Sequence, residues 1–365
     1  MTDQGWPTPA GALLTIDLGA LQHNWRIMRD RAAPARCGAA VKADAYGLGL
    51  IRAGKALYEA GCDCFFVSQA AEGADLRPHV GAADIYVLNG VRDAALDLHR
   101  DYALKPVLNS LADIALWKGA ALPLPAALHI DTGMARLGLP ADEIEILAGD
   151  ESWQAGLTLD LVMSHLSSAD IPASPLNAGQ KALFDTARAR LGLTGVPASL
   201  ANSAGVLLGA DYHYDIVRPG LALYGANPVN GTASVVRQTV RLEAEIVQLR
   251  AVDAHTAVGY GAAHTTSGAT RIATIPVGYG DGYPRTLSHV GTAELGGYEV
   301  PIVGRISMDL ITLDVGAVPE DVAKLGARVT LIGGPIDLSA LAHKAGTVSY
   351  ELLTNLSRRI PRHTV

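Results

Sequence analysis

ARCGAAVK, residues 35–42, is a short apolar run that ends at a lysine. Similar runs alternate with longer stretches of helical period as far as about residue 225, which is typical of βα units around a parallel sheet. Counted from this run, the predicted strands are ARCGAAVK (35–42), CDCFFVS (62–68), DIYVLN (84–89), LKPVLN (104–109), PAALHID (125–131), LDLVMSH (159–165), PASLANS (197–203) and HYDIVRP (213–219). Eight strands with helices between them, in about 200 residues, favour a closed (β/α)8 barrel over an open doubly wound sheet.

The pattern changes after NPVNGTAS, residues 227–234. Strand-like runs such as RIATIPVGY and ARVTLIGG follow, with turn residues between them and little helical period. We therefore expect an α/β chain of two domains. A TIM-type barrel is predicted over residues 1–230 and a mostly β domain over residues 231–365.

Charge and hydropathy limit the possible partners of this chain. The 365 residues carry a formal net charge of −7, whereas nucleic-acid binding selects for clustered Lys and Arg. The longest uncharged stretches, such as SLANSAGVLLGA at 199–210, are too short and too polar to cross a bilayer. The first residues lack the features of a secretory signal, so we expect a cytoplasmic protein with neither a nucleic-acid nor a membrane partner.

The chain has three cysteines, Cys37, Cys62 and Cys64. The last two lie in an apolar strand-like run, where a buried free thiol is the expected state. Zinc would need a further ligand and a partner pair at suitable spacing, so no metal site is predicted.

Polar residues stand at the ends of several predicted strands. They are Lys42, Asp131, Arg136, His165, Ser203 and Arg218. Because active sites of such barrels lie at the rim formed by the carboxyl ends of the strands, we expect these side chains to meet there. A lysine partly desolvated at this rim would have a lowered pKa, which suits Schiff-base chemistry with an aldehyde.

The last two βα units contain a predicted phosphate seat. ANSAG (201–205) offers Ser203 and backbone amides, and PGLALYG (219–225) offers Gly220 directly after the final strand. Loops after the seventh and eighth strands of barrels commonly bind phosphate. A lysine together with a phosphate seat indicates pyridoxal phosphate as the cofactor.

Several motifs occur in order along the chain: AVKADAYGLG (40–49), IDTGMARLG (130–138), MSHLSSAD (163–170), ANSAG (201–205), RPGLALYG (218–225), VGYGAAH (258–264), VGYGDGYPR (277–285), VGRISMD (303–309) and SYELL…RRIPR (349–362). In order and spacing, the chain resembles bacterial alanine racemases over nearly its whole length. The resemblance implies a fold-type III pyridoxal-phosphate barrel with a β domain, working as a homodimer with shared active sites.

The resemblance also implies the catalytic residues. Lys42 would hold the cofactor and act as one of two proton carriers, and Tyr260 from the partner subunit would be the other. Racemisation needs a base on each face of a planar carbanion, so one lysine would not suffice. His165 and Arg218 are candidates for lowering the high pKa of Tyr260, and Arg218 would also face the pyridine nitrogen of the cofactor.

Binding residues follow from the same resemblance. The phosphate would be held by Tyr46, Ser203, Gly220, Leu221 and Tyr350. The substrate carboxylate would be held by Arg136 and the backbone at Met308, and the access route would be lined by Asp170, Tyr279, Arg285 and Tyr350.

The chain departs from the family pattern at His129. Many members carry a lysine there, often carbamylated, whose charge orients the arginine that corresponds to Arg136. Three possibilities stay open for this chain: His129 accepts a hydrogen bond from Arg136, a bound anion replaces the carbamate, or His129 is structural.

The predicted function is therefore racemisation of L-alanine and D-alanine, for peptidoglycan precursor supply or for catabolism of D-alanine. One alternative is a racemase of broader scope that also takes serine. A decarboxylase of the same fold type would present an acidic partner to the pyridine nitrogen, so Arg218 argues against it. A non-enzymatic pyridoxal-phosphate carrier would resemble the barrel alone, so the β domain with VGYGAAH argues against that alternative.

Overall fold

The computed structural model describes residues 11–229 and 232–365. The chain divides into two compact units. One unit spans Leu21–Arg237, and the other combines the described residues up to Ala20 with Gln238–Val365. The domain boundary that the sequence predicted, at residues 230 and 231, lies outside the described residues.

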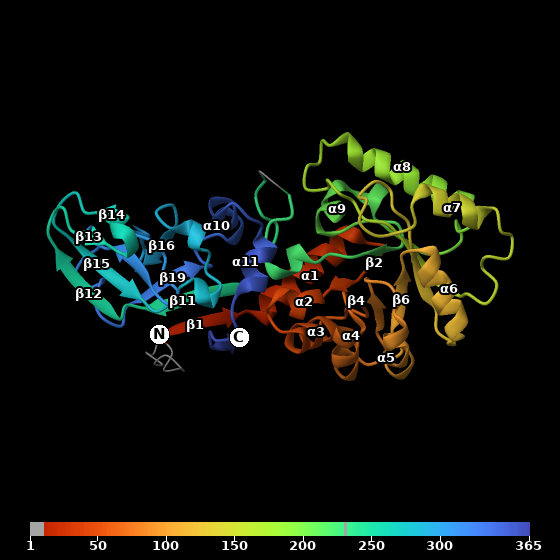
Figure 1. Ribbon diagram of the computed structural model, residues 1–365, viewed down its shortest axis with the longest axis horizontal. Helices are drawn as coiled ribbons and strands as arrows, with labels where there is room; N and C mark the ends of the chain where they lie inside the picture. The colour runs from red at the N-terminus through yellow and green to blue at the C-terminus, as the bar shows by residue number, and fades with distance from the viewer. Residues whose placement is uncertain (1–10, 230–231) are drawn as a thin grey trace. The chain divides into compact units, whose positions relative to one another are not determined.

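The unit Leu21–Arg237 contains a parallel barrel, of which strands β2, β4 and β6 are labelled in Figure 1. Neighbouring strands pair in chain order: β3 (Ala39–Ala40), β4 (Cys64–Val67), β5 (Asp84–Val87), β6 (Lys105–Leu108), β7 (Ala126–His129), β8 (Leu159–Met163) and β9 (Ala198–Ser199). Strand β10 (Ile216–Val217) closes the barrel by pairing with β2 (Arg36–Cys37), which continues into β3 after Gly38. On its other side, the amides of Asp215 and Arg218 donate to the carbonyls of Ala198 and Ala201. The (β/α)8 barrel is thus confirmed.

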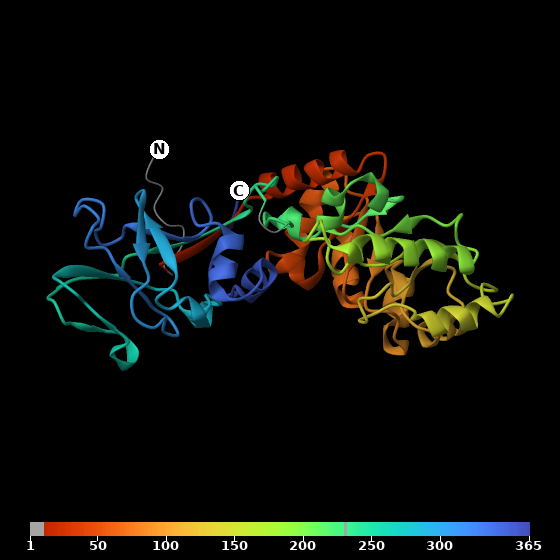
Figure 2. The ribbon, with the colours of Figure 1, turned by 90° about the horizontal axis from the view of Figure 1, so that it is seen from above.

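Helices follow the strands and cover the outside of the barrel. They are α1 (Leu18–Ala32), α3 (Leu50–Glu59), α4 (Ala70–Leu76), α5 (Leu96–Asp101), α6 (Leu111–Ala120), α7 (Ala141–Ala148), α8 (Pro175–Arg190) and α9 (Ser203–Leu208), with short turns α2 (Lys42–Tyr46), η1 (Arg77–His79), η2 (Asp93–Ala95), η3 (Ala210–Tyr212) and η4 (Leu221–Tyr224). Figure 2, like Figure 1, shows α7 and α8 side by side on this outer layer. In the ranges that the structure describes, no helix has both the length and the apolar character needed to span a bilayer.

Local signals explain where several helices begin. The hydroxyl of Ser110 accepts the amide of Asp113 at the start of α6, which satisfies one of the free N–H groups of the first turn. Pro175 occupies the first turn of α8, where a missing N–H has no consequence. The helical period is also a local feature, and it is the signal from which the sequence predicted helices between the strands.

The interior of the barrel is a packed core. It is filled by alternate residues of the strands, Ala40, Cys64, Phe66, Tyr86, Val107, Ala127, Leu161, Met163 and Ile216. Side chains of a strand alternate between its two faces, so Phe65 points away from Phe66. The rings of Phe66 and Tyr86 stack with centroids 5.2 Å apart. A ligand must therefore bind at a rim of this barrel, not within it.

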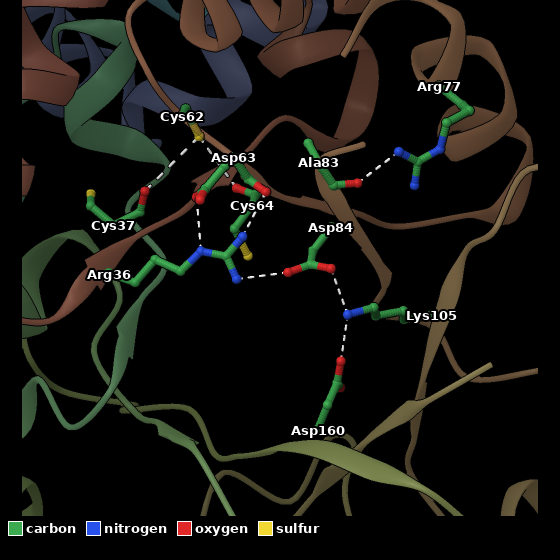
Figure 3. Close-up of polar contacts among 10 residues, drawn as sticks. All are labelled: Arg36, Cys37, Cys62, Asp63, Cys64, Arg77, Ala83, Asp84, Lys105 and Asp160. Atoms are coloured by element: carbon green, nitrogen blue, oxygen red, sulfur yellow. Dashed lines mark hydrogen bonds and ion pairs between the residues drawn. The ribbon is translucent and has the colours of Figure 1, made fainter. Parts of the chain in front are cut away.

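Charged residues form a chain of ion pairs at the end of the barrel where the strands begin (Figure 3). Arg36 pairs with Asp63 at 2.8 Å and with Asp84 at 2.7 Å. Lys105 bridges Asp84, at 2.5 Å, and Asp160. The chain of alternating charges ties β2, β5, β6 and β8 together at the end of the barrel opposite the predicted site.

We expect Lys105→Met to lower the free energy of unfolding by about 2–4 kcal/mol, because two partly buried carboxylates lose their shared cation. The side chains of Lys105, Asp84 and Asp160 are 17%, 24% and 28% exposed. Urea unfolding measures the effect. Arg100→Met is the control, since the ion pairs of Arg100 are on the surface and are expected to matter little. Equal losses in the two variants would contradict the prediction.

The same charges predict an acid limit of stability. Burial raises the pKa of Asp84, but the bonds from Lys105 and Arg36 outweigh burial and hold that pKa below its usual value. A carboxyl group with a lowered pKa stabilises the fold above about pH 4 and loses this effect as the pH falls. The stability difference between wild type and Lys105→Met should shrink on acidification.

The other unit is mostly β, as predicted. Its largest sheet has the order β17-β16-β19-β11-β1-β20, formed by β17 (Tyr298–Pro301), β16 (Thr292–Leu295), β19 (Arg328–Ile332), β11 (Val240–Glu245), β1 (Ala12–Ile16) and β20 (Arg362–Thr364). The remaining strands are β12 (Gln248–Val252), β15 (Thr270–Ile275), β18 (Ile311–Asp314), β13 (Ala257–Val258) and β14 (His264–Thr265), and the helices are η5 (Tyr260–Ala262), η6 (Tyr279–Asp281), η7 (Arg285–Leu287), α10 (Leu338–Ala345) and α11 (Ser349–Asn355).

Strand β1 differs from the domain prediction. The predicted barrel domain began at residue 1, but β1 pairs antiparallel with β11 and parallel with β20. Its run of buried apolar residues fits a β-strand wherever the partner strands lie in the sequence. The described residues up to Ala20 thus belong with the β unit.

Candidate functional site

Loops at the carboxyl ends of the barrel strands carry the predicted rim residues. Lys42 follows β3, Arg136 follows β7, His165 follows β8, and Ser203 and Arg218 follow β9 and β10. Lys42 is half-buried, and burial is the main reason that its pKa lies below the usual value for lysine. The nearby charges of Arg136 and Arg218 lower this pKa further. The rim therefore holds an amine that loses its proton more readily than an exposed lysine.

The turn that follows Lys42 has an uncommon backbone. Ala43, Asp44, Ala45 and Tyr46 have φ angles of +55°, +54°, +53° and +55°, so α2 is a left-handed turn. For residues with a Cβ atom, left-handed helical backbone costs about 1–2 kcal/mol per residue. The segment that carries Lys42 and Tyr46 is therefore strained and depends on contacts outside itself.

Arg218 is almost completely buried, with 6% of its surface exposed. Its guanidinium donates to the hydroxyl of Ser199 and, at 2.6 Å, to the carbonyl of Ser164. Burial lowers the pKa of Arg218 to about 10, so the group stays protonated near neutral pH. Its remaining N–H groups can donate to a ligand acceptor at the rim.

His165 is neutral near pH 7. Burial, followed by the positive charges of Arg218 and Arg136, lowers the pKa of His165 well below its usual value. The residue is confirmed at the strand-end position that the sequence predicted, directly after Ser164 beyond β8. A neutral imidazole has one donor and one acceptor nitrogen, so it can relay a hydrogen bond.

The predicted phosphate seat is built around Ser203. Its hydroxyl oxygen accepts the amides of Gly220 and Ala222 at 2.9 and 3.1 Å. A hydroxyl has two acceptor positions and one proton, so the O–H of Ser203 can donate to a bound group. A Cβ atom at Gly220 would lie 2.3 Å from the hydroxyl oxygen of Tyr46, so only glycine lets these groups approach. Leu221 begins η4 directly after Gly220.

The hydroxyl of Tyr46 is brought to this seat by packing of its ring. The ring stacks on Tyr224 with centroids 4.4 Å apart, and the hydroxyl of Tyr224 donates to the carbonyl of Ala40. The seat thus combines hydroxyl groups from two separate loops beside Lys42. Hydroxyl donors beside an amine of lowered pKa fit a phosphorylated aldehyde.

His129 is buried, and its hydrogen bond to Asn109 defines its tautomer. The side-chain amide nitrogen of Asn109 donates to the carbonyls of Leu88 and Val107 at 3.0 and 2.9 Å, so Oδ1 of Asn109 faces His129 Nδ1 at 2.8 Å. Nδ1 is therefore the donor and Nε2 the acceptor. Burial, then the charges of Arg218 and Arg136, lower the pKa of His129 to about 3. His129 is therefore neutral and presents one acceptor nitrogen, Nε2, at this position.

The loop that carries Arg136 is folded by the carboxylate of Asp131. Oδ1 of Asp131 accepts the amides of Gly133, Met134 and Ala135 at 2.9, 2.9 and 3.2 Å. The side chain of Arg136 is exposed at the rim, and its charge reaches Lys42, His129 and His165. Asp170 lies in the loop that follows β8.

The remaining predicted residues belong to the β unit. Tyr260 in η5 is 71% exposed, and Tyr279, Met308 and Tyr350 are 43%, 54% and 42% exposed. Arg285 begins η7. The segments of Tyr279 and Met308 adjoin, since the amide of Gly280 donates to the carbonyl of Met308 at 2.8 Å. This unit therefore presents several large apolar side chains on its surface.

Sequence reasoning missed two residues of the site. One is Asn109, which ends a predicted strand. The rule that polar residues at the carboxyl ends of barrel strands line the site, here called the strand-end rule, identified Lys42 and could have identified Asn109 too. The other is Glu72, whose Oε1 accepts the amide of Ala43, the residue after Lys42, at 2.6 Å. Glu72 gave no such signal, because it lies within the first turn of α4. Cys62 and Cys64 are buried free thiols, as predicted, and Cys37 is a buried free thiol as well.

Comparison with known proteins covers both units. The family model for the N-terminal domain of alanine racemase matches residues 16–228, and the model for its C-terminal domain matches residues 239–364. The alanine racemase of Rhodospirillum rubrum is 48% identical over 359 residues, which cover 97% of this chain and 96% of the relative.

Other relatives carry different physiological labels. A catabolic alanine racemase of Mesorhizobium japonicum is 42% identical, covering 100% of this chain and 97% of the relative. A biosynthetic alanine racemase of Agrobacterium fabrum is also 42% identical, covering 96% and 92%. Among solved structures, alanine racemase from Bartonella henselae with covalently bound pyridoxal phosphate has a TM-score of 0.93 at 36% identity, covering 98% of this chain and 100% of that chain.

Proposed function

The chain belongs to the alanine racemase family of pyridoxal-phosphate-dependent racemases, and on this premise we propose that it interconverts L-alanine and D-alanine with Lys42 and Tyr260 as its two bases. The observation that carries the proposal is the rim itself, where Lys42 with its lowered pKa stands beside Arg136, Arg218 and the phosphate seat. An amine that is readily deprotonated is the form that attacks an aldehyde.

Pyridoxal phosphate, when bound, supplies the conjugated ring that delocalises the electron pair left on Cα after proton removal. We propose that Lys42 binds its aldehyde carbon and that Tyr46, Ser203, Gly220, Leu221 and Tyr350 hold its phosphate. The fit rests on the free proton of the Ser203 hydroxyl and on the close approach of Tyr46 to Gly220.

Arg218 is proposed to donate a hydrogen bond to the pyridine nitrogen. Because its guanidinium is protonated at neutral pH, it leaves that nitrogen without a proton. A pyridine ring held by Arg218 would withdraw electrons less strongly than one held by a carboxylic acid. This weaker withdrawal favours return of a proton to Cα over side reactions such as transamination.

The two bases act on opposite faces of Cα. The Lys42 amine holds or releases a proton on one face, and the Tyr260 phenol does so on the other. His165, neutral and next to Arg218, is proposed to link Tyr260 to that arginine through hydrogen bonds. Arg136 and the backbone N–H of Met308 are proposed to donate hydrogen bonds to the substrate carboxylate, which has no proton to donate.

We propose a homodimer in which the β unit of one subunit supplies Tyr260 to the barrel of its partner. The exposure of Tyr260, Tyr279, Met308 and Tyr350 supports an interface on this unit, because large side chains of this kind are more often covered by a partner than left in water. Tyr279 and Arg285, with Asp170, would then line the access route. The cytoplasmic location stays a prediction, and both D-alanine supply for peptidoglycan and D-alanine catabolism fit the reaction.

Chiral analysis of purified protein tests the proposal. L-alanine and D-alanine, each incubated separately, should both reach equal amounts of the two enantiomers, since enantiomers have equal free energies. L-serine, run in parallel, should react more slowly by at least about tenfold, a ratio typical of one added group in a closed pocket. Serine reacting faster than alanine would replace the proposal with the broader racemase.

A further inference from the structure

The left-handed turn α2 is closed by its own backbone. The amides of Gly47 and Gly49 donate to the carbonyls of Ala43 and Asp44, each at 2.8 Å. The carboxylate of Asp44 accepts the amide of Leu50 at 2.7 Å. These bonds lie within one stretch of chain, so they define the turn but do not attach it to the neighbouring βα unit.

That attachment is made by Glu72, in the first turn of α4. Its Oε2 accepts the amides of Ser68 and Gln69 at 2.8 and 3.2 Å, which fixes the side chain to the start of its own helix. Its Oε1 accepts the amides of Ala43 at 2.6 Å and Asp44 at 3.4 Å. One carboxylate thus joins the start of α4 to the two residues that directly follow Lys42.

We propose that Glu72 is a positioning residue, whose carboxylate holds the left-handed turn so that Lys42 and Tyr46 both reach the cofactor site. The inference rests on the proposed function for the role of Lys42. Bonds from a charged acceptor to backbone N–H groups are stronger than neutral ones, which suits a turn that opposes the backbone preference of alanine.

The negative charge of Glu72 also acts on the pKa of Lys42, which an uncharged hydrogen-bond acceptor would not do. Burial and the charges of Arg136 and Arg218 lower the pKa of Lys42, whereas Glu72 raises it. His165, which lies close enough to Lys42 for their charges to interact, is neutral near pH 7. A neutral side chain at position 72 should therefore lower the pKa of Lys42 further.

Glu72→Gln, in the full-length protein, separates these effects. An amide has one acceptor oxygen, so it can serve only one of the two pairs of N–H groups. We expect hydrogen exchange of the Ala43 and Asp44 amides to rise by about 5- to 30-fold. We also expect the pH profile for covalent attachment of added pyridoxal phosphate to shift to lower pH, with slower attachment above the midpoint.

Glu143→Gln is the matched control. Oε2 of Glu143 also accepts a backbone amide of the neighbouring βα unit, that of Leu111 at 3.1 Å. Within the described residues, Glu143 has no hydrogen bond to the turn after Lys42. This variant should keep the wild-type exchange of residues 43 and 44 and the wild-type pH profile.

A second substitution, Ala43→Gly, tests the role of Glu72 in the turn independently. Glycine adopts the left-handed region without the Cβ penalty, so Ala43→Gly relieves strain in the turn. In the Glu72→Gln background it should restore part of the attachment rate but leave the pH profile shifted, because the charge is still missing. If Glu72→Gln alone does not fold, the comparison is made between Ala43→Gly and the double variant.

Wild-type exchange and a wild-type pH profile in Glu72→Gln would overturn the proposal, and so would equal effects in Glu143→Gln. Hydrogen exchange is measured without cofactor, so it decides the role of Glu72 in the turn by itself. Failure of the wild-type protein to attach pyridoxal phosphate at Lys42 would instead contradict the proposed function.

Discussion

Lys42→Ala is expected to abolish covalent attachment of pyridoxal phosphate and racemisation of alanine together. The amine that binds the aldehyde is also the proton carrier on one face of Cα, so a single substitution removes both functions. Alanine is small and uncharged and leaves the rest of the rim in place. Visible absorbance and intact mass measure attachment, and chiral analysis measures turnover.

Lys55→Ala provides the control, since Lys55 is an exposed lysine of α3 in the same unit. It should retain attachment and turnover. A folded Lys42→Ala protein that racemises alanine at a normal rate would eliminate Lys42 as the catalytic lysine.

Tyr260→Phe is expected to keep the bound cofactor and to lose activity by about 100- to 10,000-fold in both directions, the usual contribution of a general acid or base. Each direction needs one group to remove a proton and another to supply it, so the rates from L-alanine and from D-alanine should both fall. Phenylalanine keeps the ring and removes only the hydroxyl. Initial rates from L-alanine and from D-alanine measure the effect.

Tyr298→Phe is the matched control, because Tyr298 is a partly exposed tyrosine on β17 of the same unit. It should have wild-type activity. A loss of less than threefold in Tyr260→Phe, in either direction, would reject the role of this phenol.

Mixing the two inactive variants tests whether the site is shared between subunits. A heterodimer of Lys42→Ala and Tyr260→Phe subunits contains one site with both residues and one with neither. Random exchange of equal amounts makes half of the dimers mixed, so about a quarter of the wild-type activity should return. No recovery after demonstrated subunit exchange would place both bases in the same subunit.

The sequence predicted the barrel well because its signals are local. Eight short apolar runs alternate with segments of helical period, and this alternation is the pattern of a (β/α)8 barrel. The strand-end rule then found Lys42, Arg136, His165, Ser203 and Arg218, because topology alone brings the carboxyl ends of barrel strands to one rim.

Features that depend on distant contacts were not predicted. The pairing of β1 with β11 and β20 joins residues 12–16 to the second half of the chain, and the apolar run of β1 does not identify its partners. The segment KADAY, residues 42–46, contains no glycine, so its residues prefer right-handed backbone. Its left-handed turn exists because Glu72 and the ring of Tyr224 hold it in place.

Deuterium incorporation at Cα shows whether two bases on opposite faces exchange protons with solvent. Unlabelled L-alanine is incubated with the enzyme in deuterated water, and both enantiomers are isolated at low conversion. With two bases, we expect deuterium at Cα in nearly all D-alanine formed and little in the remaining L-alanine, and the mirror result from D-alanine. Product that retains the substrate's own hydrogen at Cα would show that one group carries the proton from face to face, and would exclude the two-base mechanism.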